Sequence, residues 1–187
     1  MKEDQVLRNM ITDLSEGTGY SLARQFLEGV RFMHHNLVAH LDLKPDNIVI
    51  GANTQLRIID FSVSVRVPLL ESRIKGYQGT KGWVAPEVER NPDVGYQPIL
   101  ADLWSAGQVI QYLAKNVDFL ASQLQDPDPR QRPLLSTIRI DLMFQRPLEK
   151  RKLDVDAQGK EEVKRICVPP CRSVRHVTRL SGTSSCS

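Results

Sequence analysis

The feature that most constrains this chain is a polar run, H-L-D-L-K-P-D-N, at positions 40 to 47. Four more short motifs follow it in a fixed order: D-F-S at 60 to 62, A-P-E at 85 to 87, D-L-W-S-A-G at 102 to 107, and R-P at 132 and 133. Any one of them alone is typical of a turn or a helix start with solvated charges. Chance does not predict all five in one order, so we interpret them as parts of one site.

The apolar pattern predicts a mainly helical chain that contains one small β-hairpin. Apolar residues at steps of four, four and three predict a helix from about Ser21, with that serine as its N-cap: Leu22, Phe26, Val30 and Met33. Two β-type runs, at 47–50 and 56–61, flank the turn residues 51–54 and predict the hairpin. Residues 62–87 are predicted to form a long loop, and further helices are predicted at 99–114, 117–124 and 134–144.

Charge divides the chain into a near-neutral body and a basic tail. Residues 1–141 hold 15 basic and 17 acidic side chains, whereas residues 142–187 hold 10 basic and 5 acidic side chains. All three cysteines lie in the tail, so the body is no disulfide scaffold, and a reducing, intracellular setting fits it, whether cytoplasm or nucleus. The spacing of Cys167, Cys171, His176 and Cys186 is too irregular for a typical zinc site. No apolar run approaches the roughly 18 residues that a membrane span needs.

In this order and spacing the motifs resemble the C-terminal lobe of a eukaryotic protein kinase of the serine/threonine type, over roughly residues 20–141. The resemblance implies an α+β fold that is mainly α-helical, namely a protein-kinase-like C-lobe with a small β-hairpin and no N-lobe. It divides the chain into an N-terminal lead-in (1–19), a truncated C-lobe (20–141) and a basic tail that is flexible by composition (142–187).

The resemblance implies roles for residues around a phosphate-transfer site. Asp42 matches the catalytic aspartate, which orients or accepts the proton of the attacking hydroxyl, and Lys44 matches the lysine that neutralises charge on the transferred phosphoryl group. Asn47 and Asp60 match the two positions that hold Mg²⁺, a cation that prefers oxygen ligands. The implied cofactors are therefore ATP and Mg²⁺, and Val49 would form part of the floor under the adenine.

Further matches are structural by resemblance. Thr80 would contact the catalytic aspartate, and His40 and Phe61 would stack as part of the regulatory spine. Asp102 would hold the backbone of the catalytic loop. Because no N-lobe covers it, the face near Val49 and Phe61 is expected to be exposed and apolar.

An internal ion pair is also implied by the resemblance. Glu87 and Arg132 would tie the end of the activation segment to the later helices. Losing one partner of such a buried pair typically costs about 3–5 kcal/mol. Trp83 and Trp104 are expected in the core rather than against a ligand.

The chain departs from the family pattern in four places. It contains no Gly-rich loop, no V-A-I-K lysine and no αC glutamate, which are the parts that cover and position the ATP phosphates. Leu41 stands where regulated kinases have an arginine that pairs with activation-loop phosphate, and Ser62 stands where a hinge glycine is usual. Only 25 positions separate Gly107 from Arg132, which leaves no room for a full helix G. From the first departure we expect phosphate transfer by this chain alone to be very slow or absent.

These observations leave three functions open. Retention of Asp42, Lys44, Asn47 and Asp60 favours an ATP-dependent serine/threonine protein kinase that acts on a protein hydroxyl. The missing N-lobe parts favour a non-catalytic, pseudokinase-like module that binds a protein partner. Nucleic-acid binding through the tail is disfavoured, because the basic residues there have no aromatic residues between them. No membrane partner is expected.

Overall fold

A computed structural model describes residues 5–9, 14–90, 92–114 and 117–144 of the chain. The helices are α1 (Glu16–His35), α2 (Pro86–Arg90), α3 (Pro98–Leu113), α4 (Asp118–Leu124) and α5 (Ile140–Met143). The strands are β1 (Gln5–Val6), β2 (Val38–Ala39), β3 (Ile48–Ile50), β4 (Leu56–Ile58) and β5 (Val65–Arg66). Short 3-10 turns complete the order: η1 (Leu7–Asn9), η3 (Pro45–Asn47), η4 (Pro129–Gln131) and η5 (Leu135–Thr137). This is the expected mainly helical α+β fold.

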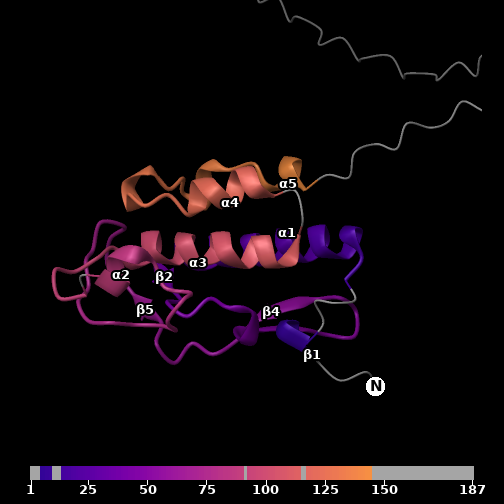
Figure 1. Cartoon of the computed structure of the whole chain (residues 1–187), viewed down its shortest axis with the longest axis horizontal. Coiled ribbons are helices and arrows are strands. Elements are labelled where there is room, and N and C mark those ends of the chain that lie inside the picture. Colours follow the sequence, from indigo (N-terminus) through magenta and orange to yellow (C-terminus); the bar gives the residue numbers. More distant parts are fainter. Residues whose placement is uncertain (1–4, 10–13, 91, 115–116, 145–187) are drawn as a thin grey trace, which may run out of the picture. The chain divides into compact units, whose positions relative to one another are not determined.

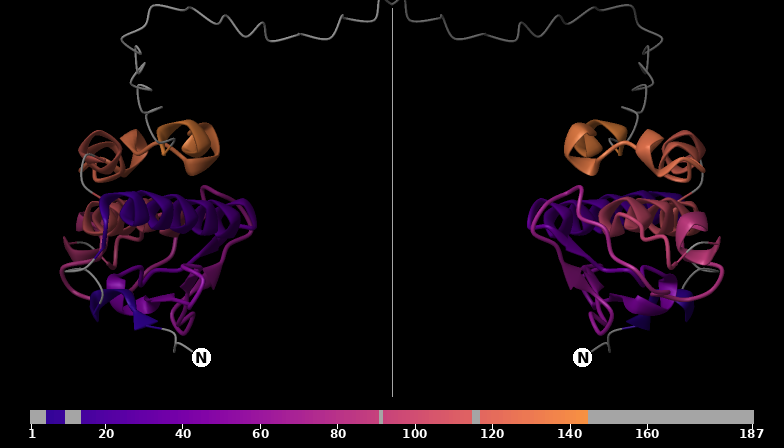
Figure 2. Two further views of the ribbon diagram at one scale, coloured as in Figure 1. Left: turned by 90° about the vertical axis from the view of Figure 1, so that its right-hand side faces the viewer. Right: turned by 90° about the vertical axis from the view of Figure 1, so that its left-hand side faces the viewer.

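Helices α1 and α3 lie side by side as a central layer, with the strands on one side and α4 and α5 on the other (Figures 1 and 2). Twelve of the sixteen residues of α3 are buried, because neighbours pack on most of its surface. Gly19 allows the close approach of α1, since a Cβ there would overlap the backbone carbonyl oxygen of Leu113. The backbone of α3 therefore forms a rigid support for the segments packed around it.

Helix α1 begins five residues earlier than the apolar pattern predicted. Its N-cap is Ser15, whose hydroxyl accepts a hydrogen bond from the backbone N–H of Thr18 at 3.3 Å. The prediction that Ser21 caps this helix was wrong. Glycine usually weakens a helix, but Gly19 serves the close packing against α3, which the local pattern does not reveal.

The predicted hairpin is confirmed and gains a third strand. Strands β3 and β4 pair antiparallel, with Ile48 opposite Ile58 and Ile50 opposite Leu56. Strand β1 pairs with the other edge of β3, which the sequence did not predict. Leu7, directly after β1, is fully buried in the main core cluster. Residues 5–9 therefore pack as part of the fold.

The helices predicted at 99–114 and 117–124 are confirmed as α3 and α4, but the one predicted at 134–144 was wrong. That stretch holds the short turn η5 and the separate helix α5, with extended backbone at Ile138 between them. Leu135 and Ile140 are both buried in the core. Residues five apart on one helix would point about 140° away from each other, so two short turns bury both side chains where one helix does not.

The predicted long loop at 62–87 contains one short strand and ends where α2 begins. Strand β5 pairs with β2, and an isolated bridge joins Ile74 to Tyr96. A second, smaller apolar cluster, which includes Leu41, Val84 and Tyr96, packs against this segment. The loop is thus held in place by packing as well as by hydrogen bonds.

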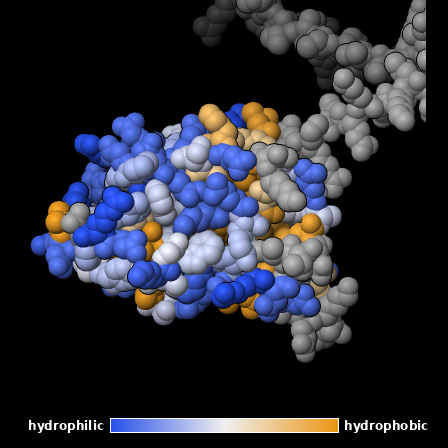
Figure 3. All heavy atoms as spheres, viewed as in Figure 1, coloured by the Kyte–Doolittle hydropathy of each residue, from blue (hydrophilic) through white to orange (hydrophobic). Residues whose placement is uncertain are grey.

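On the side visible in Figure 3, apolar side chains form small separate groups. The side visible in Figure 3 is largely hydrophilic, with small apolar groups, one of them over α4 and α5. Phe61 is 49% exposed, as expected, whereas Val49 is partly covered beside its pairing partner Val6 on β1. Both tryptophans are partly buried and pack against the apolar clusters.

Two sequence expectations fall outside the described residues. The basic tail with its three cysteines lies at positions beyond 144, so its predicted flexibility and lack of a zinc site stay predictions. Within the described ranges, no helix is both long and apolar enough to cross a membrane.

Candidate active site

A buried carboxylate on α3 shapes the loop between β2 and β3. Asp102 Oδ2 accepts the backbone N–H of His40 at 2.6 Å, and its Oδ1 accepts that of Leu41 at 2.7 Å. His34, near the end of α1, places its Nε2 3.1 Å from Asp102 Oδ2. The Asp102 side chain is wholly shielded from solvent, so these three partners replace the water that a carboxylate needs. This anchoring supports the left-handed backbone of Leu41, whose φ is 65°.

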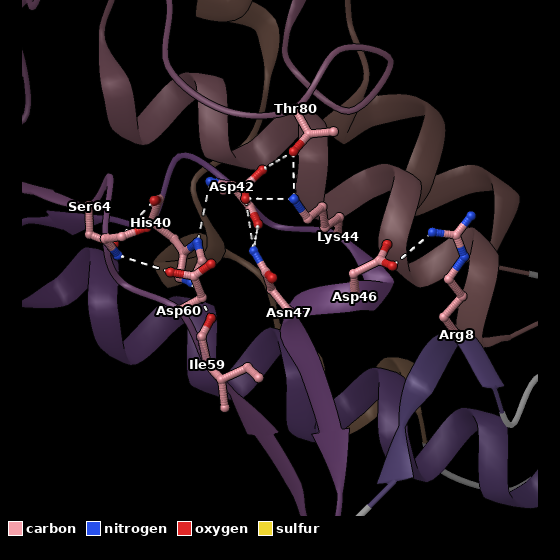
Figure 4. Close-up of polar contacts among 11 residues, drawn as sticks. Arg8, His40, Asp42, Lys44, Asp46, Asn47, Ile59, Asp60, Ser64 and Thr80 are labelled. Carbon is pink, nitrogen blue, oxygen red and sulfur yellow. Dashed lines mark hydrogen bonds and ion pairs between the residues drawn. The ribbon is translucent and has the colours of Figure 1, made fainter.

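Directly after this anchor, Asp42 is the centre of a compact polar network (Figure 4). Its Oδ1 accepts the hydroxyl of Thr80 at 2.6 Å, and its Oδ2 accepts Lys44 Nζ at 2.8 Å. Lys44 Nζ also donates to Thr80 Oγ1 at 2.6 Å. Asn47 Nδ2 donates to Oδ2 at 2.9 Å and to the backbone carbonyl of Asp42 at 2.8 Å. Three side chains therefore fix the orientation of one carboxylate.

The network also sets the charge state of Asp42. Burial alone would raise the pKa of this carboxyl, but hydrogen bonds from Lys44, Thr80 and Asn47, together with the lysine charge, lower the pKa below its ordinary value. Asp42 is thus an anion at neutral pH. An oriented carboxylate beside an ammonium group suits the binding of a hydroxyl whose oxygen gains negative charge on attack.

Asn47 and Asp60 supply oxygen atoms beside this carboxylate. Both amide hydrogens of Asn47 point toward Asp42, and its Oδ1 accepts no hydrogen bond from the described part of the chain. Asp60 lies near His40 (Figure 4), is exposed, and has a left-handed φ of 62°. Hydrogen bonds from Ser62 lower the pKa of Asp60. A free amide oxygen and an ionised, accessible carboxylate form a donor set that fits Mg²⁺.

His40 and Phe61 contact each other behind the network. Their ring centroids are 4.8 Å apart. His40 Nδ1 accepts the backbone N–H of Asp42 at 3.3 Å, so the proton belongs on Nε2, which lies 3.0 Å from the carbonyl oxygen of Ile59. Ser64 Oγ donates to the backbone carbonyl of His40 at 3.1 Å. The segment around Asp60 is therefore fastened to the loop that carries Asp42.

The ion pair implied by the resemblance is present in the structure. Arg132 contacts Glu87 through two hydrogen bonds of 2.7 and 2.9 Å, and its side chain is wholly buried. The guanidinium also donates to the carbonyl oxygens of Leu100 and Asp126 and lies 5.2 Å from the ring centre of Trp104. Arg132 thus joins α2, α3 and the turn before η4.

Not every candidate joins the Asp42 network. Val49 lies on β3, with Val6 and Arg57 as strand partners, on the sheet rather than in the polar network. Sequence reasoning also missed two contacts. His34 gave only the weak signal of ending a helix before the motif loop, and Arg8, whose Nη1 lies 2.8 Å from Asp46 Oδ1, gave none.

Two departures from the family pattern have clear structural consequences. Leu41 is 5% exposed and packs in the second apolar cluster, where a charged side chain would lose its water. Helix α4 begins five residues after α3 ends, and Gly107 lets it pack directly on α3, since a Cβ there would lie 3.0 Å from the Ala121 carbonyl oxygen.

The sequence profile of the protein kinase domain matches residues 1–184. This chain belongs to the protein kinase domain family. Its relatives include a probable serine/threonine-protein kinase, KKQ8, of Candida glabrata, which is 46% identical over 90 residues and covers 46% of this chain and 12% of its own length. The Bos taurus phosphorylase b kinase gamma catalytic chain, liver/testis isoform, is 37% identical over 103 residues, which are 52% of this chain and 24% of that protein.

A third relative of this kinase-family chain matches over a longer stretch. The Arabidopsis thaliana CBL-interacting serine/threonine-protein kinase 8 is 28% identical over 171 residues, which are 75% of this chain and 38% of that protein. The chain therefore spans well under half the length of each of these three relatives.

Proposed function

We propose that this chain carries the acceptor-binding and metal-binding residues of an ATP-dependent serine/threonine protein kinase. The observation that supports this most is the Asp42 network, in which Lys44, Thr80 and Asn47 hold one ionised carboxylate in a fixed orientation. Positioning and preformed charges supply nearly all of the catalysis in phosphoryl transfer.

The proposed step begins with a substrate serine or threonine hydroxyl that donates its hydrogen bond to Asp42. The hydroxyl oxygen attacks the γ-phosphorus of ATP, the bond from that phosphorus to the β–γ bridging oxygen breaks, and ADP leaves. The hydroxyl proton passes to Asp42, while Lys44 neutralises charge on the transferred group. Asn47 and Asp60 would hold Mg²⁺, which neutralises the phosphate oxygens when bound.

The test separates nucleotide binding from transfer with the whole 187-residue chain. Thermal unfolding is followed with and without ATP and Mg²⁺, and phosphate transfer to serine peptides is followed with labelled γ-phosphate. We expect ATP with Mg²⁺ to raise the unfolding temperature of the wild type, as mass action requires of a ligand that binds the native state. D60N should lose the magnesium-dependent part of this shift.

Transfer by the wild-type chain alone is expected to be very slow, and D42N should lower it about 100-fold or more while retaining the thermal shift with ATP. D93N, at an exposed aspartate outside the network, is the matched control and should leave both readouts unchanged. Binding of ATP without transfer in the wild type would make the chain a nucleotide-binding interaction module. If the wild type showed neither ATP binding nor phosphate transfer, the proposal would be overturned.

A further inference from the structure

The turn at residues 80–83 is held rigidly beside the Asp42 network. The backbone N–H groups of Trp83 and Val84 both donate to the carbonyl oxygen of Thr80, at 3.0 and 3.2 Å. From α3, Gln108 Nε2 donates to the Gly82 carbonyl at 3.0 Å and Ser105 Oγ donates to the Trp83 carbonyl at 2.8 Å. The first residue of the turn, Thr80, contacts Asp42 itself. The backbone from which the side chains of this turn extend is therefore held at a fixed position relative to Asp42.

Lys81 is the charged residue that this turn exposes. Its side chain is exposed, and it has no ion pair or hydrogen bond with any residue that the structure describes. Neighbouring Cα atoms are about 3.8 Å apart, so the Cα of Lys81 lies about one residue length from that of Thr80. Within the reach of its side chain, Lys81 can therefore meet a peptide residue about two positions or fewer from a hydroxyl bound at Asp42.

The other charges around the network are already occupied. Asp42 is paired with Lys44 at 2.8 Å, and Asp46, further along the same loop, is paired with Arg8 at 2.8 Å. Asp60 belongs to the proposed metal site. Asp42 and Asp46 are thus paired with cations, whereas the ammonium of Lys81 has no partner among the described residues and can attract an anionic peptide.

The surrounding segment has the same sign of charge. Positions 61–90 hold five basic and three acidic residues. One of the acidic residues, Glu87, is paired with the buried Arg132. This segment therefore carries a small net positive charge.

We propose that Lys81 selects acceptor peptides that carry an anionic side chain within two residues of the serine or threonine hydroxyl. This inference rests on the phosphoryl-transfer function proposed above, because it assumes a peptide hydroxyl at Asp42. A carboxylate and a phosphorylated side chain offer the same chemistry to an ammonium, and the phosphate carries the larger charge, about −1.5 to −2 at neutral pH.

The experiment measures peptide binding without ATP, so it does not depend on catalysis. Fluorescent peptides with one central serine are varied at each of the two positions on either side, with glutamate, phosphoserine, neutral glutamine or lysine. Dissociation constants are measured by fluorescence anisotropy for the whole chain at low and at physiological salt. At one position or more, we expect glutamate to bind about two- to fivefold more tightly than glutamine, as for a solvent-exposed ion pair. Phosphoserine should bind more tightly still, and the difference should shrink with salt.

Charge reversal at Lys81 identifies the residue responsible. In K81E the preferred peptide should change from the glutamate to the lysine form at the same position. K75E, at another exposed cation of the segment, is the matched control and should keep the wild-type order. Both substitutions are at the surface, so neither is expected to unfold the protein. Equal effects of K75E and K81E would overturn the proposal, as would absence of peptide binding or a lack of discrimination between glutamate and glutamine.

Phosphate transfer to the preferred peptide is then measured separately with ATP and Mg²⁺. Selective binding that depends on Lys81 without any transfer would support the inference and overturn the proposed catalytic function. Transfer without any discrimination between glutamate and glutamine peptides would support the proposed catalytic function and overturn the inference about Lys81.

Discussion

Gly79, the residue before Thr80, lies directly against the backbone of Leu41, the residue before Asp42. A Cβ at Gly79 would overlap the Leu41 carbonyl oxygen and would lie 2.8 Å from Val84 Cγ1. The φ of Gly79 is 102°, a conformation that glycine adopts without strain. This contact brings the Thr80 turn and the Asp42 loop together, so the absence of one side chain determines the geometry of the candidate site.

G79A is therefore expected to be more harmful than G76A. Gly76 also has a positive φ, of 91°, but a Cβ there would meet nothing within 4 Å. Both variants bear the backbone strain, and only G79A adds overpacking, which typically costs about 1–3 kcal/mol. Urea denaturation should show this extra loss of unfolding free energy in G79A. Equal losses in the two variants would show that the contact with Leu41 is unimportant.

Removing one partner of the Glu87–Arg132 pair should destabilise the protein strongly. E87A leaves the wholly buried guanidinium of Arg132 without its counter-ion, and we expect a loss of about 3 kcal/mol in the free energy of unfolding, the lower end for buried pairs because Glu87 is 19% exposed. R130A, which breaks the exposed pair with Asp128, is the control and should leave stability unchanged. A double variant, E87A with R132A, should lose much less than the sum of its parts.

Stability should depend on the ionisation of Asp42 only at acid pH. The pKa of this group is lower in the folded protein than its ordinary value of 3.8, so its contribution is fully present above that value and is lost as pH falls through the folded pKa. Unfolding free energies between pH 2.5 and 6 should therefore fall more steeply in the wild type than in D42N. T80V removes one donor and should raise the Asp42 pKa, which carboxyl NMR titration would detect. An unchanged Asp42 pKa in T80V would contradict the network.

Leu7 should contribute to stability as a core residue. Its side chain is fully buried beneath β3, so L7A should lower the unfolding free energy by about 2–5 kcal/mol. L69A is the matched control, because Leu69 is 63% exposed, and it should change stability by no more than about 0.5 kcal/mol. A small effect of L7A would mean that residues 5–9 do not pack in solution as they do in the structure.

The spacing of apolar and turn residues predicted helices and strands well where it agrees with the tertiary packing. The hairpin and helices α3 and α4 were predicted because turn residues and apolar spacing mark them directly. The start of α1 and the stretch after Leu134 were predicted wrongly. In the first case a glycine lies inside the helix because it is needed for the contact with α3. In the second case two short turns bury Leu135 and Ile140, which one helix would point about 140° apart.

The sequence by itself determined which chemical groups the candidate site contains. Asp42, Lys44, Asn47 and Asp60 could be singled out because their types and their order along the chain are sufficient to mark them. The resemblance implied the Glu87–Arg132 pair and the role of Asp102, but the pairing of Arg8 with Asp46, 38 residues away, was decided only by the tertiary structure. Folding brings residues together that are far apart in the sequence, so only the structure shows that Asp46 is paired while Lys81 has no ion-pair partner among the described residues.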